Sequence, residues 1–113
     1  MTIAERRVLP QRRVTETAVI TFRVPFNGAR RDYTVSTGFF PDSRQPAEVF
    51  VTGAKVGTEV EATARDGAIL ISLALQHGIS LEVMRGAITR EENGEASTIV
   101  GAVLDMLYRE KQT

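Results

Sequence analysis

The hydrophobic pattern of this chain changes its period once, and that change limits the folds that it can adopt. Between residues 18 and 52, apolar and polar side chains alternate in three short runs, which is typical of half-buried strands. From residue 58 onward, apolar residues recur every three or four positions, as they do on helices that pack against a core. This order predicts an α+β fold, in which a three-stranded antiparallel meander is covered on one face by about three helices.

Turn residues divide the first part of the chain into three strands, which we expect within residues 14–56. Ile20 and Phe22 lie on one face of the first strand, and Asn27-Gly28 supplies the positive φ angles of a tight hairpin. The alternating residues of the return strand are Tyr33, Val35, Thr37 and Phe39. Residues 48–52 form the third strand.

Capping residues mark three helices, which we expect near residues 58–77, 80–89 and 95–110. Thr58 and Glu61 form a capping box at the start of the first helix, and Gly78 fits its left-handed end. Ser80 caps the second helix. Because the first helix is apolar nearly all round, we predict a central core helix. The predicted core includes Ile20, Phe22, Ile69 and Leu73.

The composition limits the chemistry of the chain more than its fold. A length of 113 residues with 42% hydrophobic residues fits one globular domain. The absence of cysteine excludes a disulfide, a cysteine-ligated metal site and a thiol nucleophile. No apolar run approaches the roughly 20 residues of a membrane helix, and the N-terminus lacks a secretory signal. We therefore expect a cytoplasmic protein that does not act at a membrane, and no cofactor.

The first part of the chain is basic, although the net charge of the whole is zero. Residues 1–31 contain seven arginines and only two glutamates. We define residues 1–13 as the arm and residues 14–113 as a single domain; the arm's arginines are Arg6, Arg7, Arg12 and Arg13. We favour the interpretation that the arm is solvated and flexible. The alternatives are that the arm binds nucleic acid or docks on an acidic surface of its own kind in an oligomer.

The loop between the third strand and the first helix is a candidate phosphate site. Backbone N–H groups at a helix N-terminus, together with a lysine, suit an anion. The residues concerned are Gly53, Lys55, Val56, Gly57 and Thr58. The spacing is not that of a Walker A loop, and Glu59 and Glu61 place negative charge where the anion would bind. We therefore favour a structural turn over a ligand site.

Residues 70–88 have the spacing of a helix-turn-helix motif. In that interpretation the second helix exposes Ser80, Leu81, Glu82 and Arg85, which is a poor set for contacting phosphates or bases. A capped helical hairpin in a core explains the same pattern. His77 is best explained as a helix C-terminal residue. The group Glu91, Glu92 and Glu95 is a solvated loop cluster. No catalytic residue and no metal ligand is predicted.

Three runs in the second half of the chain resemble the TSCPD domain. They are E-V-F-V at 48–51, G-A-K-V-G-T-E at 53–59 and L-I-S-L-A-L-Q-H-G-I-S-L-E at 70–82. The resemblance covers roughly residues 19–107, with the arm outside it. This domain occurs in adenosylcobalamin-dependent ribonucleotide reductases, outside the catalytic barrel, and also as short free-standing proteins. The resemblance therefore implies a link to deoxyribonucleotide synthesis.

The chain departs from the family at the motif that names it. In place of Thr-Ser-Cys-Pro-Asp it has Ser97-Thr98-Ile99-Val100-Gly101. The reductase reaction also needs a thiyl radical and a reducing cysteine pair, which a chain without cysteine cannot supply. The leading hypothesis is a stand-alone accessory module that is not catalytic by itself and contacts a reductase subunit or a nucleotide. The alternatives are a small nucleic-acid-binding regulator and a homo-oligomeric structural protein that pairs through sheet edges.

Overall fold

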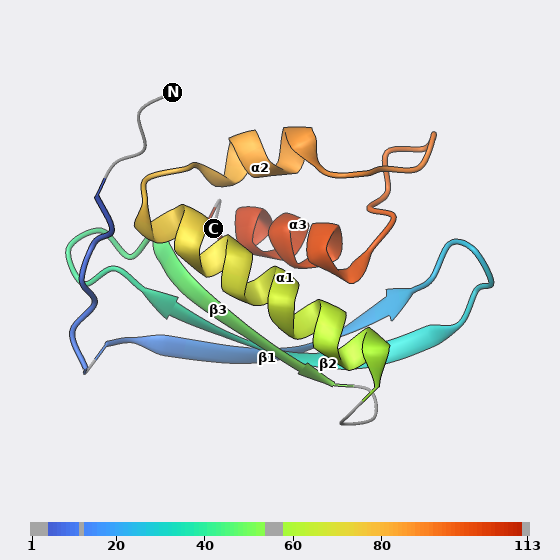
Figure 1. Cartoon of the computed structure of the whole chain (residues 1–113), viewed down its shortest axis with the longest axis horizontal. Helices are drawn as coiled ribbons and strands as arrows, with labels where there is room; N and C mark the ends of the chain where they lie inside the picture. The colour runs from blue at the N-terminus through green and yellow to red at the C-terminus, as the bar shows by residue number, and fades with distance from the viewer. Residues whose placement is uncertain (1–4, 12, 54–57, 112–113) are drawn as a thin grey trace.

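Three strands followed by three helices make up the computed structural model, which describes residues 5–11, 13–53 and 58–111. The strands are β1 (Thr15–Arg23), β2 (Arg30–Phe39) and β3 (Pro46–Gly53). The helices are α1 (Glu59–Gln76), α2 (Leu81–Ala87) and α3 (Ile99–Lys111) (Figure 1). The predicted α+β fold is confirmed.

The sheet is an antiparallel meander in the order β1-β2-β3. Val35 in the central strand lies opposite both Ala18 and Val51, so side chains of the same parity share one face. The first hairpin closes where the Val24 N–H donates to the Ala29 carbonyl at 2.8 Å. Gly28 has a φ of 72°, as predicted, whereas Asn27 does not adopt the positive φ predicted for it and instead accepts a hydrogen bond from the Ala29 N–H.

The predicted caps begin and end the first two helices. The Thr58 hydroxyl accepts a hydrogen bond from the Glu61 N–H at 3.2 Å, and the Ser80 hydroxyl accepts one from the Val83 N–H at the same distance. After α1 the chain reverses at Gly78, whose φ is 85°. These local signals are confirmed because each depends on residues within one turn of one another.

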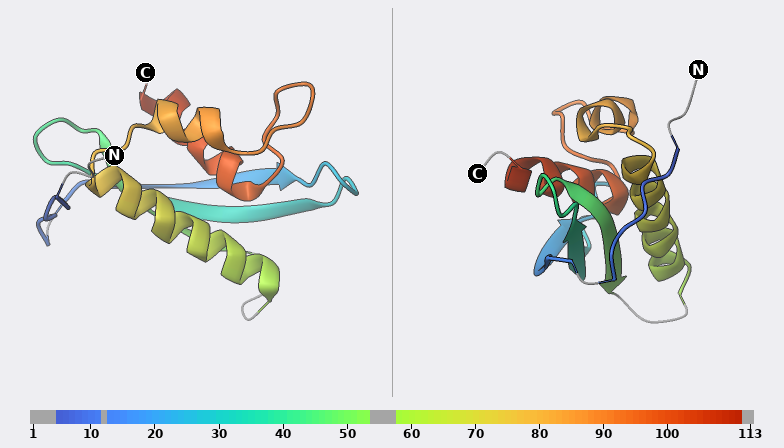
Figure 2. Two further views of the ribbon diagram at one scale, coloured as in Figure 1. Left: turned by 45° about the horizontal axis from the view of Figure 1, so that its top comes forward. Right: turned by 90° about the vertical axis from the view of Figure 1, so that its left-hand side faces the viewer.

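All three helices lie on one side of the sheet. The α1 helix runs along β3, α3 lies beside it, and α2 forms the outermost layer (Figure 2). Side chains from both layers meet in one buried cluster, whose largest fully buried members include Tyr33, Val35, Val49, Val103, Leu104 and Leu107. Among the helices of the described residues, none combines the length and hydropathy needed to cross a bilayer.

The prediction that α1 is buried nearly all round is wrong. Its buried residues include Ala64, Ala68 and Ile71, whereas Ile69 is 50% exposed and Leu70 is 66% exposed. Ile69 therefore does not belong to the core cluster, and neither does Leu73, which is only half-buried; Phe22 belongs to the cluster and Ile20 packs against it. The reason is that α1 lies at the β3 side of the sheet, so other elements cover only part of its circumference.

Candidate functional site

The outer edge of β3 is bonded by side chains of α1 instead of by another strand. The Ser72 hydroxyl accepts from the Val49 N–H at 2.8 Å and lies 3.1 Å from the Val49 carbonyl oxygen. One turn later, the Gln76 amide donates to the Ala47 carbonyl at 3.1 Å. In an antiparallel strand every second residue directs its N–H and C=O to the same edge. Val51 therefore presents its N–H and C=O to this edge as well.

A groove of about 390 Å³ lies between this edge and α1, and we call it the edge groove. Phe50 from β3 and Ile69 from α1 line it, and they are 57% and 50% exposed. Arg65, which pairs with the buried carboxylate of Glu61, also lines the groove. Exposed apolar side chains bordered by charged ones are typical of a surface that binds another protein.

The arm reaches the same groove, because Arg6 is one of its lining residues. Its Nε donates to Gln76 Oε1 at 2.6 Å, and the Arg7 N–H donates to the Gln76 carbonyl at 2.8 Å. The described part of the arm therefore runs past the C-terminal end of α1 (Figure 2, right). The Arg7 guanidinium also donates to both Asp42 carboxylate oxygens at 3.1 Å and stacks 3.8 Å from the centre of the Phe40 ring. This hydrogen bond lowers the pKa of Asp42.

Arg13 binds a carboxylate that is nearly buried on the otherwise open sheet face. Its Nε donates to Glu48, whose side chain is only 8% exposed, and this hydrogen bond raises the pKa of Arg13. The Glu48 side chain lies over Gly38, since a Cβ atom there would come within 2.6 Å of Glu48 Oε2. Of the four predicted arm arginines, Arg6, Arg7 and Arg13 thus contact the body of the chain. Arg12 lies outside the described residues.

The predicted phosphate loop is described only at its two ends. Gly53 ends β3, and Thr58 caps α1. Lys55, Val56 and Gly57 lie outside the described residues, so a phosphate site there stays a prediction. Thr52, which precedes the loop, lines the edge groove. The groove therefore extends from the arm to the end of β3.

The residues of the helix-turn-helix interpretation have structural roles. Leu81 is buried with 3% exposure, which corrects the expectation that it is exposed. Glu82 pairs with Lys111 at 3.1 Å, and Arg85 donates to Asp105 at 2.8 Å. His77 is the C-cap residue of α1, in agreement with the prediction.

A carboxylate on α3 binds one arginine from α2 and one from the loop that follows α2. Asp105 accepts from Arg90 at 2.7 and 3.0 Å as well as from Arg85. These bonds, with that of Arg90 the strongest, lower the pKa of Asp105 to about 2 against partial burial. The cluster fixes the loop of residues 89–98, in which Arg90 and Ala96 form a bridge, against α2 and α3. Ser97 and Thr98 immediately precede α3.

The apolar part of the edge groove is not predicted by the sequence patterns. By periodicity, Phe50 and Ile69 are ordinary strand and core residues, because periodicity does not show which flank of a helix is left uncovered. The first helix is apolar over more of its circumference than one sheet can cover. That excess of apolar residues is the sequence signal that could have indicated an exposed apolar surface. Within the described residues no group of three or more His, Asp or Glu side chains gathers as a metal site.

Comparison with known proteins assigns the family. The model of the TSCPD domain matches residues 5–109, which extends the resemblance into the arm and covers nearly the whole chain. No solved structure matches this chain. The chain therefore belongs to the TSCPD domain family.

Proposed function

We propose that this protein is a non-catalytic accessory module that binds a ribonucleotide reductase through the edge groove. The observation that carries the proposal is the family match over residues 5–109, since TSCPD domains are associated with ribonucleotide reductases. The absence of cysteine supports an accessory role, because the reductase reaction needs thiols.

The edge groove suits an extended segment of a partner protein. Phe50 and Ile69 offer apolar surface along the exposed edge of β3, where an extended segment can lie against them. Arg6 supplies positive charge within the same groove, whereas Arg65 is already paired with Glu61. We therefore expect the bound segment to combine apolar side chains with at least one carboxylate.

The alternative of nucleic-acid binding gains less support from the contacts of the arm. Arg7 and Arg13 are paired with Asp42 and Glu48, which reduces the charge that they offer to phosphates. Arg85, the one basic residue of the helix-turn-helix interpretation, is bound to Asp105. We therefore rank binding to a reductase above binding to DNA or RNA.

The test is a binding titration between this chain and an adenosylcobalamin-dependent reductase large subunit from the same organism. We expect a measurable dissociation constant for the natural chain. Phe50→Ala and Ile69→Glu should each weaken binding about 10-fold or more, as expected for apolar anchors near the centre of an interface.

The matched control is Phe26→Ala, which removes an exposed phenylalanine outside the groove and should leave this affinity unchanged. Absence of binding at about 100 μM would contradict the proposal. Equal affinities of the natural chain and Phe50→Ala would contradict the assignment of the surface.

A further inference from the structure

The turn between β1 and β2 presents an aromatic side chain on a constrained tip. Phe26 is 94% exposed and follows Pro25, whose ring restricts φ. The Gly28 N–H donates to the Val24 carbonyl at 2.7 Å, and the Ala29 N–H donates to Asn27 Oδ1 at 2.9 Å. A side chain held on such a turn loses little conformational entropy when it binds.

The same hairpin carries positive charge that its own fold does not neutralise. Arg23 and Arg30 lie directly opposite each other across the two strands, an arrangement in which like charges repel. Both are exposed, and neither forms an ion pair with any other residue that the structure describes. A lone exposed phenylalanine is ordinary, but one between unpaired arginines on a constrained tip is a candidate contact point.

A second groove, of about 500 Å³, lies among the three helices, and we call it the helix groove. Its walls are almost entirely apolar and include Leu70 and Ile71 of α1, Met84 of α2, Ile88, and Val100 and Leu104 of α3. Leu70, 66% exposed, leaves apolar surface in contact with solvent. The helix groove does not share Phe50 or Ile69 with the edge groove.

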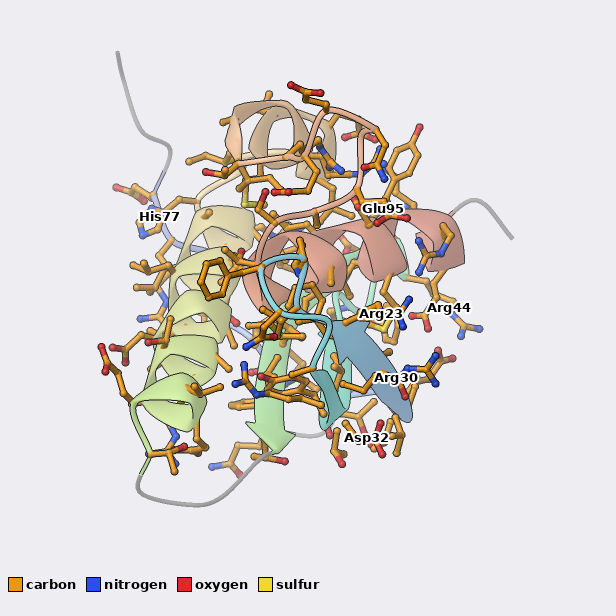
Figure 3. All side chains as sticks on the ribbon, turned by 90° about the vertical axis from the view of Figure 1, so that its right-hand side faces the viewer. Arg23, Arg30, Asp32, Arg44, His77 and Glu95 are labelled. Atoms are coloured by element: carbon orange, nitrogen blue, oxygen red, sulfur yellow. The ribbon has the colours of Figure 1, made fainter. Side chains whose placement is uncertain are left out.

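The loop that joins two wall residues of the helix groove carries charge opposite to that of the hairpin. Ile88 and Val100 are wall residues that flank the loop of residues 89–98, which contains the exposed Glu92 and Glu95. Figure 1 shows this loop and the β1–β2 hairpin at the same end of the molecule. Figure 3, seen from that end, shows Arg23, Arg30 and Glu95. Arg90 and Asp105 hold the acidic loop in place.

We propose that this end of the molecule binds a second copy of the chain, with Phe26 of each copy in the helix groove of the other. Arg23 and Arg30 then face Glu92 and Glu95 of the second copy. An aromatic tip with basic flanks matches an apolar groove whose adjoining loop is acidic, and the hairpin and that loop lie at one end. Each copy carries the aromatic tip and the groove that accepts it, as well as the basic and the acidic residues. Two copies can therefore make the same contacts with each other about a twofold axis.

The first test is sedimentation of the natural chain and Phe26→Ala over a concentration series. We expect a concentration-dependent dimer, with the dimer dissociation constant of Phe26→Ala raised about 10-fold or more. Phe50→Ala is the matched control and should dimerise as the natural chain does. A natural chain that stays monomeric at about 1 mM, or equal dimerisation of Phe26→Ala, would overturn the proposal.

The second test uses charge reversal in two separate variants. One combines Arg23→Glu with Arg30→Glu, and the other combines Glu92→Lys with Glu95→Lys. Each alone should be monomeric, because equal charges then face each other in both contacts of the dimer. An equimolar mixture should form a one-to-one heterodimer, since both contacts again join opposite charges. All four positions are exposed, and thermal unfolding followed by circular dichroism confirms that each variant is folded.

The mixing experiment is specific for the proposed contact. A mixture that stays monomeric, or a charge-reversed variant that dimerises alone, would overturn the proposal. The result does not depend on the reductase, because no reductase is present. Failure of the dimer therefore leaves the proposed function intact, and failure of reductase binding leaves the dimer intact.

Discussion

At the residue scale, two carboxylates depend on arginines that are distant in the sequence. Glu48 lies over Gly38 and binds Arg13, while Asp105 binds Arg85 and Arg90. Burying a carboxylate is costly unless it is paired and hydrogen-bonded, so both are sensitive to small changes.

Gly38→Ala should destabilise the protein. The added methyl group would lie 2.6 Å from Glu48 Oε2 and 2.8 Å from its Cγ, so Glu48 must shift and its pairing with Arg13 must weaken. We expect the free energy of unfolding in urea to fall by about 1–3 kcal/mol, typical of overpacking. Gly86→Ala is the control, because nothing lies within 4 Å of its new Cβ. If both variants are as stable as the natural chain, the close packing of Glu48 on Gly38 does not contribute to stability.

Asp105 should make the stability depend on pH in the acid range. The pKa of its carboxyl falls from 3.8 to about 2 in the folded protein, so the unfolded state takes up the proton first as the pH drops. The stabilisation is complete above about pH 5 and is lost as the pH falls towards 2. Asp105→Asn should cost about 1–2 kcal/mol at pH 7, allowing for partial solvent screening, and almost nothing at pH 2.

Urea unfolding of Asp105→Asn and the natural chain between pH 2 and pH 7 measures this difference. Asp66→Asn, at an exposed position on α1, is the control. A stability difference that is the same at pH 2 and pH 7 would show that the carboxylate charge is not its source.

At the element scale, α1 acts both as a wall of the core and as the cover of the sheet edge. An uncovered edge strand is prone to pair with other chains. Ser72 and Gln76 bond the outward backbone groups of Val49 and Ala47, so this part of β3 is occupied within the molecule.

Ser72→Ala removes the acceptor for the Val49 N–H in a half-buried position. We expect the free energy of unfolding to fall by about 1–3 kcal/mol, the usual cost of leaving a buried donor unsatisfied. Hydrogen exchange of the Val49 amide should also become faster. Thr63→Ala, at an exposed position of the same helix, should be nearly neutral. An unchanged exchange rate at Val49 would contradict the role that we give to Ser72.

At the scale of the whole molecule, the proposed roles use different surfaces. The edge groove lies between β3 and α1, whereas the contact that we propose with a second copy uses the hairpin and the helix groove. Phe50→Ala and Phe26→Ala should therefore affect one binding reaction each.

The purified chain alone should convert no ribonucleotide to a deoxyribonucleotide. The reason is the absence of cysteine, which leaves no thiol to form a thiyl radical or to supply reducing equivalents. The measurement is product formation in the presence of adenosylcobalamin and a dithiol, compared with a blank without protein. A complete reductase is the positive control, and product from the chain alone above the blank would refute the accessory role.

The elements and most of their ends follow from the sequence alone, although α3 begins at Ile99 and not near residue 95. Alternation over residues 18–52, the caps Thr58 and Ser80, and the glycines Gly28 and Gly78 all act through near neighbours, so they can be recognised without knowledge of the fold. Residues 48–59 and 70–82 also carry the family resemblance, because it depends only on the order of residues within short runs.

Only the tertiary structure decided which apolar residues stay exposed and which charges are paired. Ile69 has the same hydrophobicity whether it faces a core or a groove, and its exposure depends on how far the sheet extends beside α1. Arg13 belongs to a basic arm in the sequence, and only the fold brings Glu48 to it from 35 residues away. Contacts between residues so far apart in the sequence depend on how whole elements pack. A pattern of neighbouring residues does not show that packing.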